Sequence, residues 1–145
     1  MYLVDTNILS AGAPSRVAPT ALVEWMDAHS RVLFLSAVTI AEIEDGITKA
    51  RREGATRKAT NLAAWLETVL HLYDDRILGF DTPTARLAGA VSDRARARGH
   101  APGFADIIIA ATAQRHGLTI LSRNLRHFEP LGLAARDPFA TLPPV

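Results

Sequence analysis

The chain contains no cysteine, which excludes disulfide bonds and thiolate metal sites and makes a reducing, cytoplasmic compartment the expected one. No apolar run approaches the length that a helix needs to cross a bilayer, so we expect no membrane partner. The first residues lack the basic segment of a signal peptide and carry an acid at Asp5. The chain also lacks an excess of either charge, because its formal net charge is only +1 at pH 7. Any basic surface for nucleic acid must therefore be local.

The remaining composition is that of an ordinary folded protein. The chain has 145 residues, of which 48% are hydrophobic and 21% are charged. This length fits one domain, residues 1–145, and can bury a core without disulfide bonds. From about residue 137 the chain is rich in proline, and we expect this tail to extend over the surface.

Short apolar runs alternate with segments of helical periodicity. We expect strands at residues 2–4, 32–35, 77–80, 119–121 and 133–135. We expect a first helix at residues 20–29 and a second that Ser36 caps and that runs to Lys49 or beyond. After a basic, solvated segment at 50–60, a third helix should run to about Leu72. A fourth should start with Thr82 as N-cap and end near Gly99, and a fifth should span 104–116 with Gly117 as C-cap. The alternation predicts βαβ units and a parallel sheet, in which ligands lie outside the carboxyl ends of the strands.

Three acids fall at corresponding places in these units. Asp5 ends the first strand, Glu42 lies about one turn into the helix after the second, and Asp106 begins the most apolar helix. Helix starts that follow strands point to the carboxyl edge of a sheet, so the three can converge. Clustered carboxylates raise one another's pKa unless a cation is present. Mg²⁺ prefers oxygen ligands and can activate water against a phosphate, so the pattern predicts this chemistry.

Each acid also has a purely structural interpretation, which the residues alone leave open. Asp5 can cap a turn in the Asp-Thr-Asn sequence. Glu42 can belong to a solvated helix face with Glu44 and Asp45. Asp106 can be a favourable charge at a helix N-terminus. Taken together, three acids at equivalent positions favour a functional site.

Four blocks of the sequence resemble the conserved blocks of the PIN domain, in the same order. They are residues 1–10 (MYLVDTNILS), 36–47 (SAVTIAEIEDGI), 104–113 (FADIIIAATA) and 119–128 (TILSRNLRHF). Within that family, the chain is similar to the VapC/FitB-type toxins of bacterial type II toxin–antitoxin modules. One block would be weak support, but four in order span nearly the whole chain.

The resemblance implies a fold and an activity. The fold is an α/β, PIN-like three-layer sandwich with a central, mostly parallel sheet of four to five short strands flanked by helices. The activity is Mg²⁺- or Mn²⁺-dependent endoribonuclease cleavage of RNA by the toxin of a toxin–antitoxin module. The implied partners are a second copy of the chain, as a homodimer, and a small DNA-binding antitoxin from the adjacent gene.

The resemblance also assigns residues. Asp5, Glu42 and Asp106 match the family's metal-binding and catalytic acids. The matching supporting or RNA-contacting residues are Thr6, Asn7, Ser122, Arg123 and Asn124. Many relatives have a fourth Asp at or near the place of Asn124, and some have an acid where His127 stands. An Asn offers a carbonyl oxygen but no charge, which leaves open whether one or two metal ions bind.

Several other residues have two interpretations. Arg123 and Arg126 can hold RNA phosphates or belong to a solvated loop. The basic residues at 49–58 can face RNA or simply be solvated. Trp25 and Trp65 have the spacing of core or dimer contacts rather than of base-stacking platforms. The five histidines lack metal-ligand spacing, so zinc is not expected.

Two rival functions remain for comparison. Another phosphate enzyme on a similar sheet is disfavoured, because a haloacid-dehalogenase-type phosphatase needs an Asp where Asn7 stands, and no glycine-rich phosphate loop is present. A receiver domain would need an acidic pair before Asp5 and a late Lys, and neither is evident. The second rival is a non-catalytic or weakly active PIN-fold module that binds RNA or protein. The RNA sequence that is cut cannot be read from the chain, because specificity lies in loops and surface shape.

Overall fold

A central sheet runs through the protein, whose computed structural model describes residues 1–14 and 16–145. Within these residues the sheet has five strands in the order β3-β2-β1-β4-β5, and every neighbouring pair is parallel. The strands are β1 (Tyr2–Val4), β2 (Leu33–Ser36), β3 (Ile77–Leu78), β4 (Thr119–Leu121) and β5 (Ala135–Arg136). The prediction of a mostly parallel sheet of four to five short strands is confirmed.

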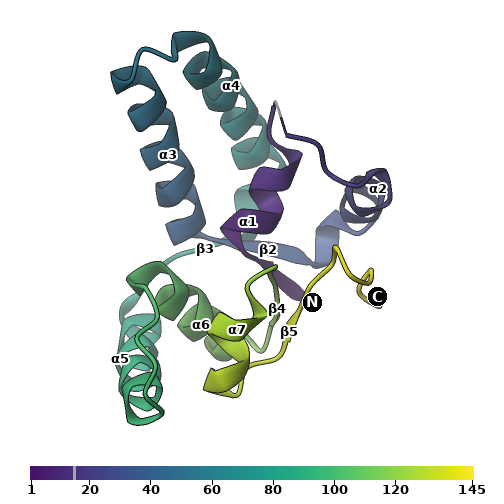
Figure 1. Cartoon of the computed structure of the whole chain (residues 1–145). Helices are drawn as coiled ribbons and strands as arrows, with labels where there is room; N and C mark the ends of the chain where they lie inside the picture. The colour runs from purple at the N-terminus through teal and green to yellow at the C-terminus, as the bar shows by residue number, and fades with distance from the viewer. Residues whose placement is uncertain (15) are drawn as a thin grey trace.

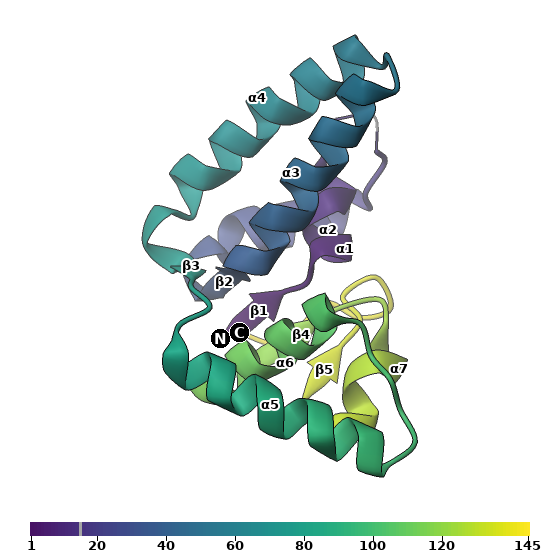
Figure 2. The same ribbon diagram turned by 90° about the vertical axis from the view of Figure 1, so that its left-hand side faces the viewer.

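Helices cover both faces of the sheet and complete three layers. The helices are α1 (Thr6–Leu9), α2 (Thr20–Ala28), α3 (Ala37–Arg52), α4 (Thr56–Leu72), α5 (Thr82–Ala97), α6 (Phe104–His116) and α7 (Leu125–Phe128). The long hairpin of α3 and α4 stands on one side with α1 and α2, while α5, α6 and α7 cover the other side (Figures 1 and 2). In the part of the chain that the structure describes, none of the helices is long and apolar enough to cross a membrane.

The chain builds the sheet outward from β1 in two directions. It passes from β1 to β2 and β3, and then returns to the other side of β1 to add β4 and β5. The two directions part between β1 and β4, where Val4 pairs with Leu121. In parallel sheets, the crevice outside the strand ends at such a switch point is the usual ligand site. Asp5 follows β1 here and Ser122 follows β4.

Local capping explains where the helices near this edge begin and end. The Ser36 hydroxyl accepts a hydrogen bond from the Val38 amide at 3.2 Å and caps α3, as predicted. Gly117 ends α6 in the left-handed region, with φ +62°, also as predicted. The predicted N-cap of α5 is wrong, because Asp81 and not Thr82 caps that helix. The Asp81 carboxylate accepts from both the amide and the hydroxyl of Thr84, at 3.0 and 2.7 Å.

Two apolar clusters fill the spaces on either side of the sheet. One packs β1 and β2 against α1 to α4 and includes Trp25, which is 7% exposed and makes an edge contact with Tyr2. The other packs Leu3 and β4 against α5, α6 and α7. The segment at 50–60 is solvated only in part, because Ala50 and Ala59 are buried where α3 turns into α4.

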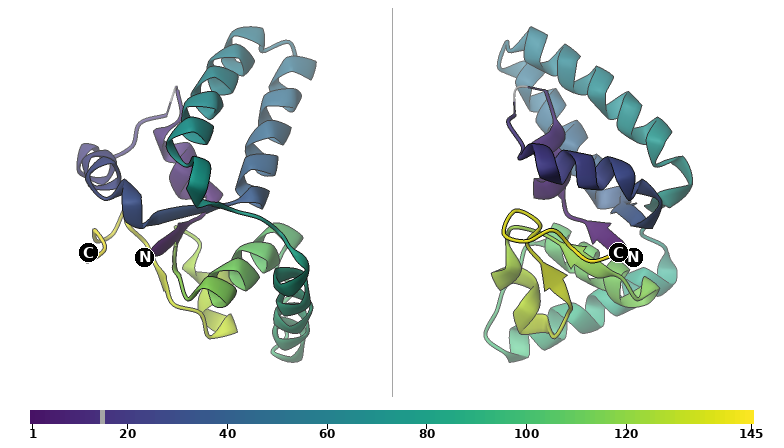
Figure 3. Two further views of the ribbon diagram at one scale, coloured as in Figure 1. Left: turned by 180° about the vertical axis from the view of Figure 1, so that it is seen from behind. Right: turned by 90° about the vertical axis from the view of Figure 1, so that its right-hand side faces the viewer.

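Three strands and the tail differ from expectation. The third strand ends at Leu78 and not at residue 80, and the fifth runs over Ala135–Arg136, so it starts two residues later and ends one residue later than predicted. The second strand, Leu33–Ser36, is shifted by one residue from the predicted 32–35. The tail does not simply extend over the surface, since Phe139 packs against the first core cluster. The Tyr2 hydroxyl also donates a hydrogen bond to the carbonyl of Pro144, which brings the two termini close together (Figure 3).

Candidate active site

Asp5 lies where β1 leaves the sheet, and its carboxylate is held by three donors. The residue is 5% exposed. One carboxylate oxygen accepts from the Thr6 amide at 2.8 Å. The other accepts from Asn7 Nδ2 at 2.9 Å and from Ser122 Oγ at 2.6 Å. The turn-capping interpretation is thus confirmed, since Asp5 is the N-cap of α1.

The residues that hold Asp5 are themselves tied together across β1 and β4. Ser122 is fully buried, and its hydroxyl accepts from the Asn124 amide at 2.9 Å and contacts Asn7 Nδ2 at 3.2 Å. The side-chain oxygen of Asn7 accepts from the Arg123 amide at 3.2 Å. Asn7 and Ser122 therefore connect the segment after β1 to the segment after β4, and both hold the same oxygen of Asp5.

The charge of Asp5 is unfavourable in the protein without a cation. Burial is the main cause that raises the pKa of this carboxyl above its ordinary value. The hydrogen bonds from Ser122 and Thr6 oppose that rise, and the negative charges of Asp106 and Glu42 add to it. A cation placed among the three acids would offset both the burial and the repulsion.

Glu42 reaches the same region from α3. Its carboxylate accepts a hydrogen bond from the Thr6 hydroxyl at 2.6 Å, and that hydroxyl also lies 3.1 Å from Thr39 Oγ1. Unlike Asp5, Glu42 is exposed, as are Glu44 and Asp45 on the same helix. All three acids therefore lie on a solvated face of α3, and Glu42 differs from Glu44 and Asp45 in its hydrogen bond to Thr6, the residue after Asp5.

Asp106 lies in the first turn of α6 and meets His127 of α7. One carboxylate oxygen is 2.8 Å from His127 Nδ1, and the two side chains are 23% and 34% exposed. That ring nitrogen is buried, and Asp106 is its nearest charged neighbour, although the pair does not meet the geometric criteria of a hydrogen bond. His127 therefore places an imidazole, and not a further acid, against Asp106.

A pocket of about 250 Å³ collects these side chains, and we call it the acid pocket. Its lining residues are Asp5, Thr6, Asn7, Ser10, Glu42, Asp106 and Asn124. The structure thus brings together the three acids that the sequence singled out, from three separate elements. Among the described residues, however, no three acids or histidines already have the spacing of a metal-binding group.

The donor chemistry of the acid pocket fits a hard divalent cation. Its lining offers carboxylate, hydroxyl and amide oxygens, and among the described residues that line it there is no imidazole or thiol. Mg²⁺ and Mn²⁺ favour such oxygen donors, and Mg²⁺ retains several waters rather than requiring a full protein cage. Water-bridged binding is therefore compatible with carboxylates that do not converge on one point.

Some predicted residues lie outside the acid pocket, and others were missed. Ser122 is buried and reaches the acid pocket through its hydrogen bond to Asp5, and the guanidinium of Arg123 lies 4.5 Å from the ring centre of Phe139. Ser10 was missed because it follows α1, a four-residue helix too short to give a periodic pattern. The contact of His127 with Asp106 joins residues far apart in the chain, and no local signal predicts it.

A family model, related sequences and solved structures all relate the chain to the same group of proteins. The family model described as "PIN domain" matches residues 2–130. "Toxin FitB" of Neisseria gonorrhoeae is 35% identical over 144 residues, covering 96% of this chain and 99% of that protein. "VapC ribonuclease Y4jK" of Sinorhizobium fredii is 33% identical, covering 96% and 98%. The crystal structure of FitAcB from Neisseria gonorrhoeae superposes with a TM-score of 0.82 at 34% identity, covering 96% and 99% of the two chains.

Proposed function

The chain belongs to the PIN-domain family, and from this premise we propose that it is a divalent-metal-dependent endoribonuclease, the toxin of a toxin–antitoxin module. The observation that carries the proposal is the acid pocket, in which Asp5, Glu42 and Asp106 meet at the switch point of a parallel sheet. Support for the substrate and the role comes from the similar proteins that are named a ribonuclease and a toxin.

In this proposal the three acids hold Mg²⁺ or Mn²⁺ through their carboxylate oxygens. When bound, the ion polarises water and offsets negative charge on the phosphate. Ser122 and Asn7 keep one oxygen of Asp5 occupied as an acceptor, which orients the other oxygen and limits its motion. Asn124 offers the pocket an amide dipole without a charge. Hydrolysis then adds one water across a phosphorus–oxygen ester bond, and the departing oxygen gains a proton.

The proposed substrate contacts extend beyond the acids. Arg126 is exposed and lines a neighbouring cavity that it shares with Asp106, where a guanidinium can bind a phosphate oxygen pair. Arg123 is exposed at the start of the same segment, and its contact with Phe139 limits its motion. We assign both to the phosphates of single-stranded RNA in the cytoplasm.

The acid pocket also suggests how such an enzyme is restrained. Without a metal it is a cluster of negative charge, and a planar guanidinium can satisfy two carboxylates at once. We therefore propose that a small antitoxin from the adjacent gene inserts an Arg into the pocket. A complex in which the partner leaves Asp5 and Asp106 open to solvent would contradict this. The homodimer implied by the family is part of the same proposal, and light scattering of the purified chain tests it.

The test of the nuclease function is cleavage of labelled single-stranded RNA by the purified protein. Mg²⁺ or Mn²⁺ should support cleavage, EDTA should stop it, and Asp106→Asn should stop it in the presence of metal. Asp106→Asn is also the control for a contaminating nuclease, because a contaminant would survive the substitution.

The alternative is a non-catalytic or weakly active PIN-fold module that binds RNA or protein. Two observations favour it: Asn124 lacks the charge of the fourth acid of many relatives, and the described acids lack ready metal spacing. RNA binding without cleavage in any metal would select this alternative.

A further inference from the structure

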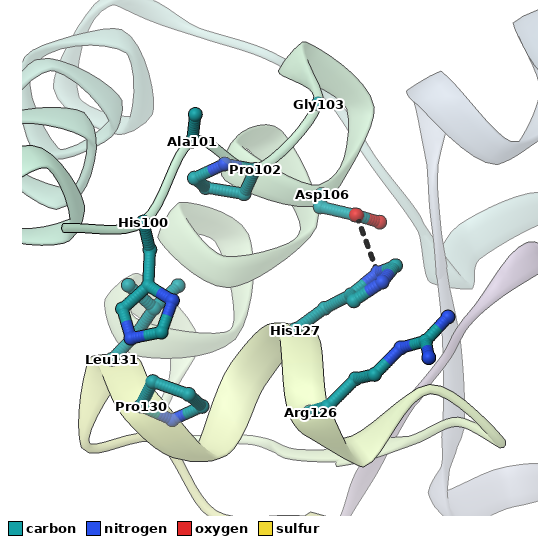
Figure 4. Close-up of a pocket in the computed structure, with 9 residues that line it drawn as sticks. All are labelled: His100, Ala101, Pro102, Gly103, Asp106, Arg126, His127, Pro130 and Leu131. Carbon is teal, nitrogen blue, oxygen red and sulfur yellow. Dashed lines mark ion pairs between the residues drawn. The ribbon is translucent and has the colours of Figure 1, made fainter.

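A second cavity adjoins the acid pocket on the far side of Asp106. It has a volume of about 300 Å³ and lies between the loop at residues 100–103, which joins α5 to α6, and the segment at 126–131 formed by α7 and the turn after it. Figure 4 shows His100 and Pro102 on one side of this cavity and Pro130 and His127 on the other. We call it the α7 cavity.

The α7 cavity and the acid pocket share one wall. Asp106 lines both, and His127 lines the α7 cavity while its ring nitrogen lies 2.8 Å from the Asp106 carboxylate. A chain that passes over Asp106 would therefore enter both spaces. Since the α7 cavity is next to the proposed reacting site, its occupant would be a neighbour of the bond that is cut.

The two spaces differ in their chemistry. The acid pocket is lined by three carboxylates. Among the described residues that line the α7 cavity, Asp106 is the one acid, and it is accompanied by the basic residue Arg126 and by His100 and His127. The rest of that lining is mostly apolar and includes Pro102, Pro130 and Leu131. Such a lining suits a ligand with a flat apolar body and an anionic group.

The walls of the α7 cavity are fixed in the protein without a ligand. The Arg98 guanidinium donates a hydrogen bond to the carbonyl of Pro130 and so ties the end of α5 to the opposite wall. The loop turns back at Gly99, where φ is +74°, and the His100 amide donates to the carbonyl of Ala95 at 2.9 Å. A proline in each wall further restricts the backbone. A preformed cavity loses less entropy when it binds a ligand.

We propose that the α7 cavity binds one unstacked nucleotide of the RNA, next to the phosphate that is cut. The proposal rests on the ribonuclease function above and adds a specificity site to it. A volume of about 300 Å³ is at the lower end of small-ligand sites, roughly 300–1,000 Å³. That size admits a single base and sugar but not a duplex. Proteins read single-stranded RNA by stacking splayed bases on flat side chains, histidine included, and by hydrogen bonds to base edges.

The residues divide this task between them. His100 is exposed and offers a stacking plane and an edge that can hydrogen-bond, while Pro102 and Pro130 provide apolar contact. Arg126 extends from α7 past His127, and Figure 4 shows its guanidinium on the side of His127 away from His100. There it can hold the phosphate of a nucleotide whose base lies against His100. This arrangement ties the identity of one base to the position of the cleaved bond.

The experiment combines a protein variant with removal of one base from the substrate. An RNA that the wild type cuts is remade with an abasic nucleotide at each position around the cleaved bond, and KM and kcat are measured with Mg²⁺. Removal of one base should raise KM about tenfold for the wild type, because one stacking contact is lost. His100→Ala should raise KM by a similar factor on the intact RNA, and the abasic RNA should then add little more. His100→Phe, which keeps a flat ring, should restore most of the affinity, and His71→Ala on α4 is the matched control.

A second measurement uses the four nucleoside 5′-monophosphates, added in EDTA to the wild-type protein observed by NMR. Amide signals of residues 100, 101, 103, 126–129 and 131, the positions in the two walls that are not proline, should shift, and His100→Ala should reduce the shifts. If the wild type cuts RNA while His100→Ala keeps its KM and the monophosphates leave these signals unmoved, the proposal is overturned. Shifts with an unchanged KM would assign the cavity to a free nucleotide and also overturn the RNA assignment. Failure of the wild type to cut any RNA is a different result, because it removes the proposed function itself.

Discussion

Asp5 and Glu42 line one pocket but are held in opposite ways. Asp5 is 5% exposed, follows a strand in the middle of the sheet, and accepts three hydrogen bonds from Thr6, Asn7 and Ser122. Glu42 is exposed on α3, and its contact with the acid pocket runs through the Thr6 hydroxyl. One side of the pocket is therefore part of the folded core, and the other side can adjust.

The acids themselves should give the largest effect. Asp5→Asn and Asp106→Asn should each lower the cleavage rate by about a hundredfold or more, since even partners of metal ligands cost 10–100-fold. Glu42→Gln should lower the cleavage rate less than Asp5→Asn does, because Glu42 is exposed and lies on the side of the pocket that can adjust. Glu44→Gln on the same helix is the matched control and should cleave normally. Asp106→Asn cleaving at the wild-type rate would show that the site is wrong.

Metal binding should stabilise the fold through the same residues. Mg²⁺ or Mn²⁺ should raise the melting temperature, because the ion binds the folded pocket and not the dispersed acids of the unfolded chain. At a hundredfold excess over Kd the gain in unfolding free energy would be about 2.7 kcal/mol. The shift should vanish in Asp5→Asn and persist in Glu44→Gln. An equal shift in all three proteins would indicate a general salt effect instead.

The hydrogen-bond donors that hold Asp5 and Glu42 can be compared directly. Ser122→Ala removes a hydrogen bond that lowers the pKa of Asp5, so it should weaken Mn²⁺ binding by about 10–100-fold. Thr6→Val removes the hydroxyl contact to Glu42 but keeps the backbone amide that Asp5 uses, and it should weaken binding less. Calorimetric titration of Mn²⁺ into both variants measures the difference. Equal losses would contradict the distinction between a fixed and an adjustable side.

Asn124 tests whether charge limits the binding of a second ion. Two ions about 3.5–4 Å apart need negative charge around them, and Asn124 supplies a dipole alone. Asn124→Asp should therefore tighten divalent binding, and Asn124→Ala should slow cleavage less than Asp106→Asn does. The same titration checks the first expectation. Two ions of similar affinity in the wild type, unchanged by Asn124→Asp, would place this residue outside the metal site.

The smallest effect concerns pH in the absence of metal. The pKa of Asp5 is raised above its ordinary 3.8 in the folded protein, chiefly by burial. Its contribution to stability is then fully present below pH 3.8 and is lost as the pH rises through the higher folded value. In EDTA, the unfolding free energy of the wild type should therefore fall relative to that of Asp5→Asn as the pH is raised from below 3.8 through the folded-state pKa. Parallel pH profiles of the two proteins would show that burial does not penalise this charge.

The sequence predicted the parts of the molecule that depend on local patterns. The strands at 2–4 and 119–121 and the helix at 104–116 lie where their apolar runs and caps place them. Because strands in a parallel sheet end at one edge, acids at equivalent ends of the units could be expected to meet, and Asp5, Glu42 and Asp106 line one pocket.

Tertiary structure alone decided what depends on residues distant in the chain. Four-residue helices such as α1 and α7 have too few positions to show a period, so the sequence gives no sign of Ser10 at the pocket or of His127 against Asp106. The docking of the tail on Tyr2 and the α7 cavity likewise depend on contacts between segments that are distant in the chain. Patterns along a chain record which face a side chain buries, whereas contacts between loops depend on how the packed layers bring those loops together.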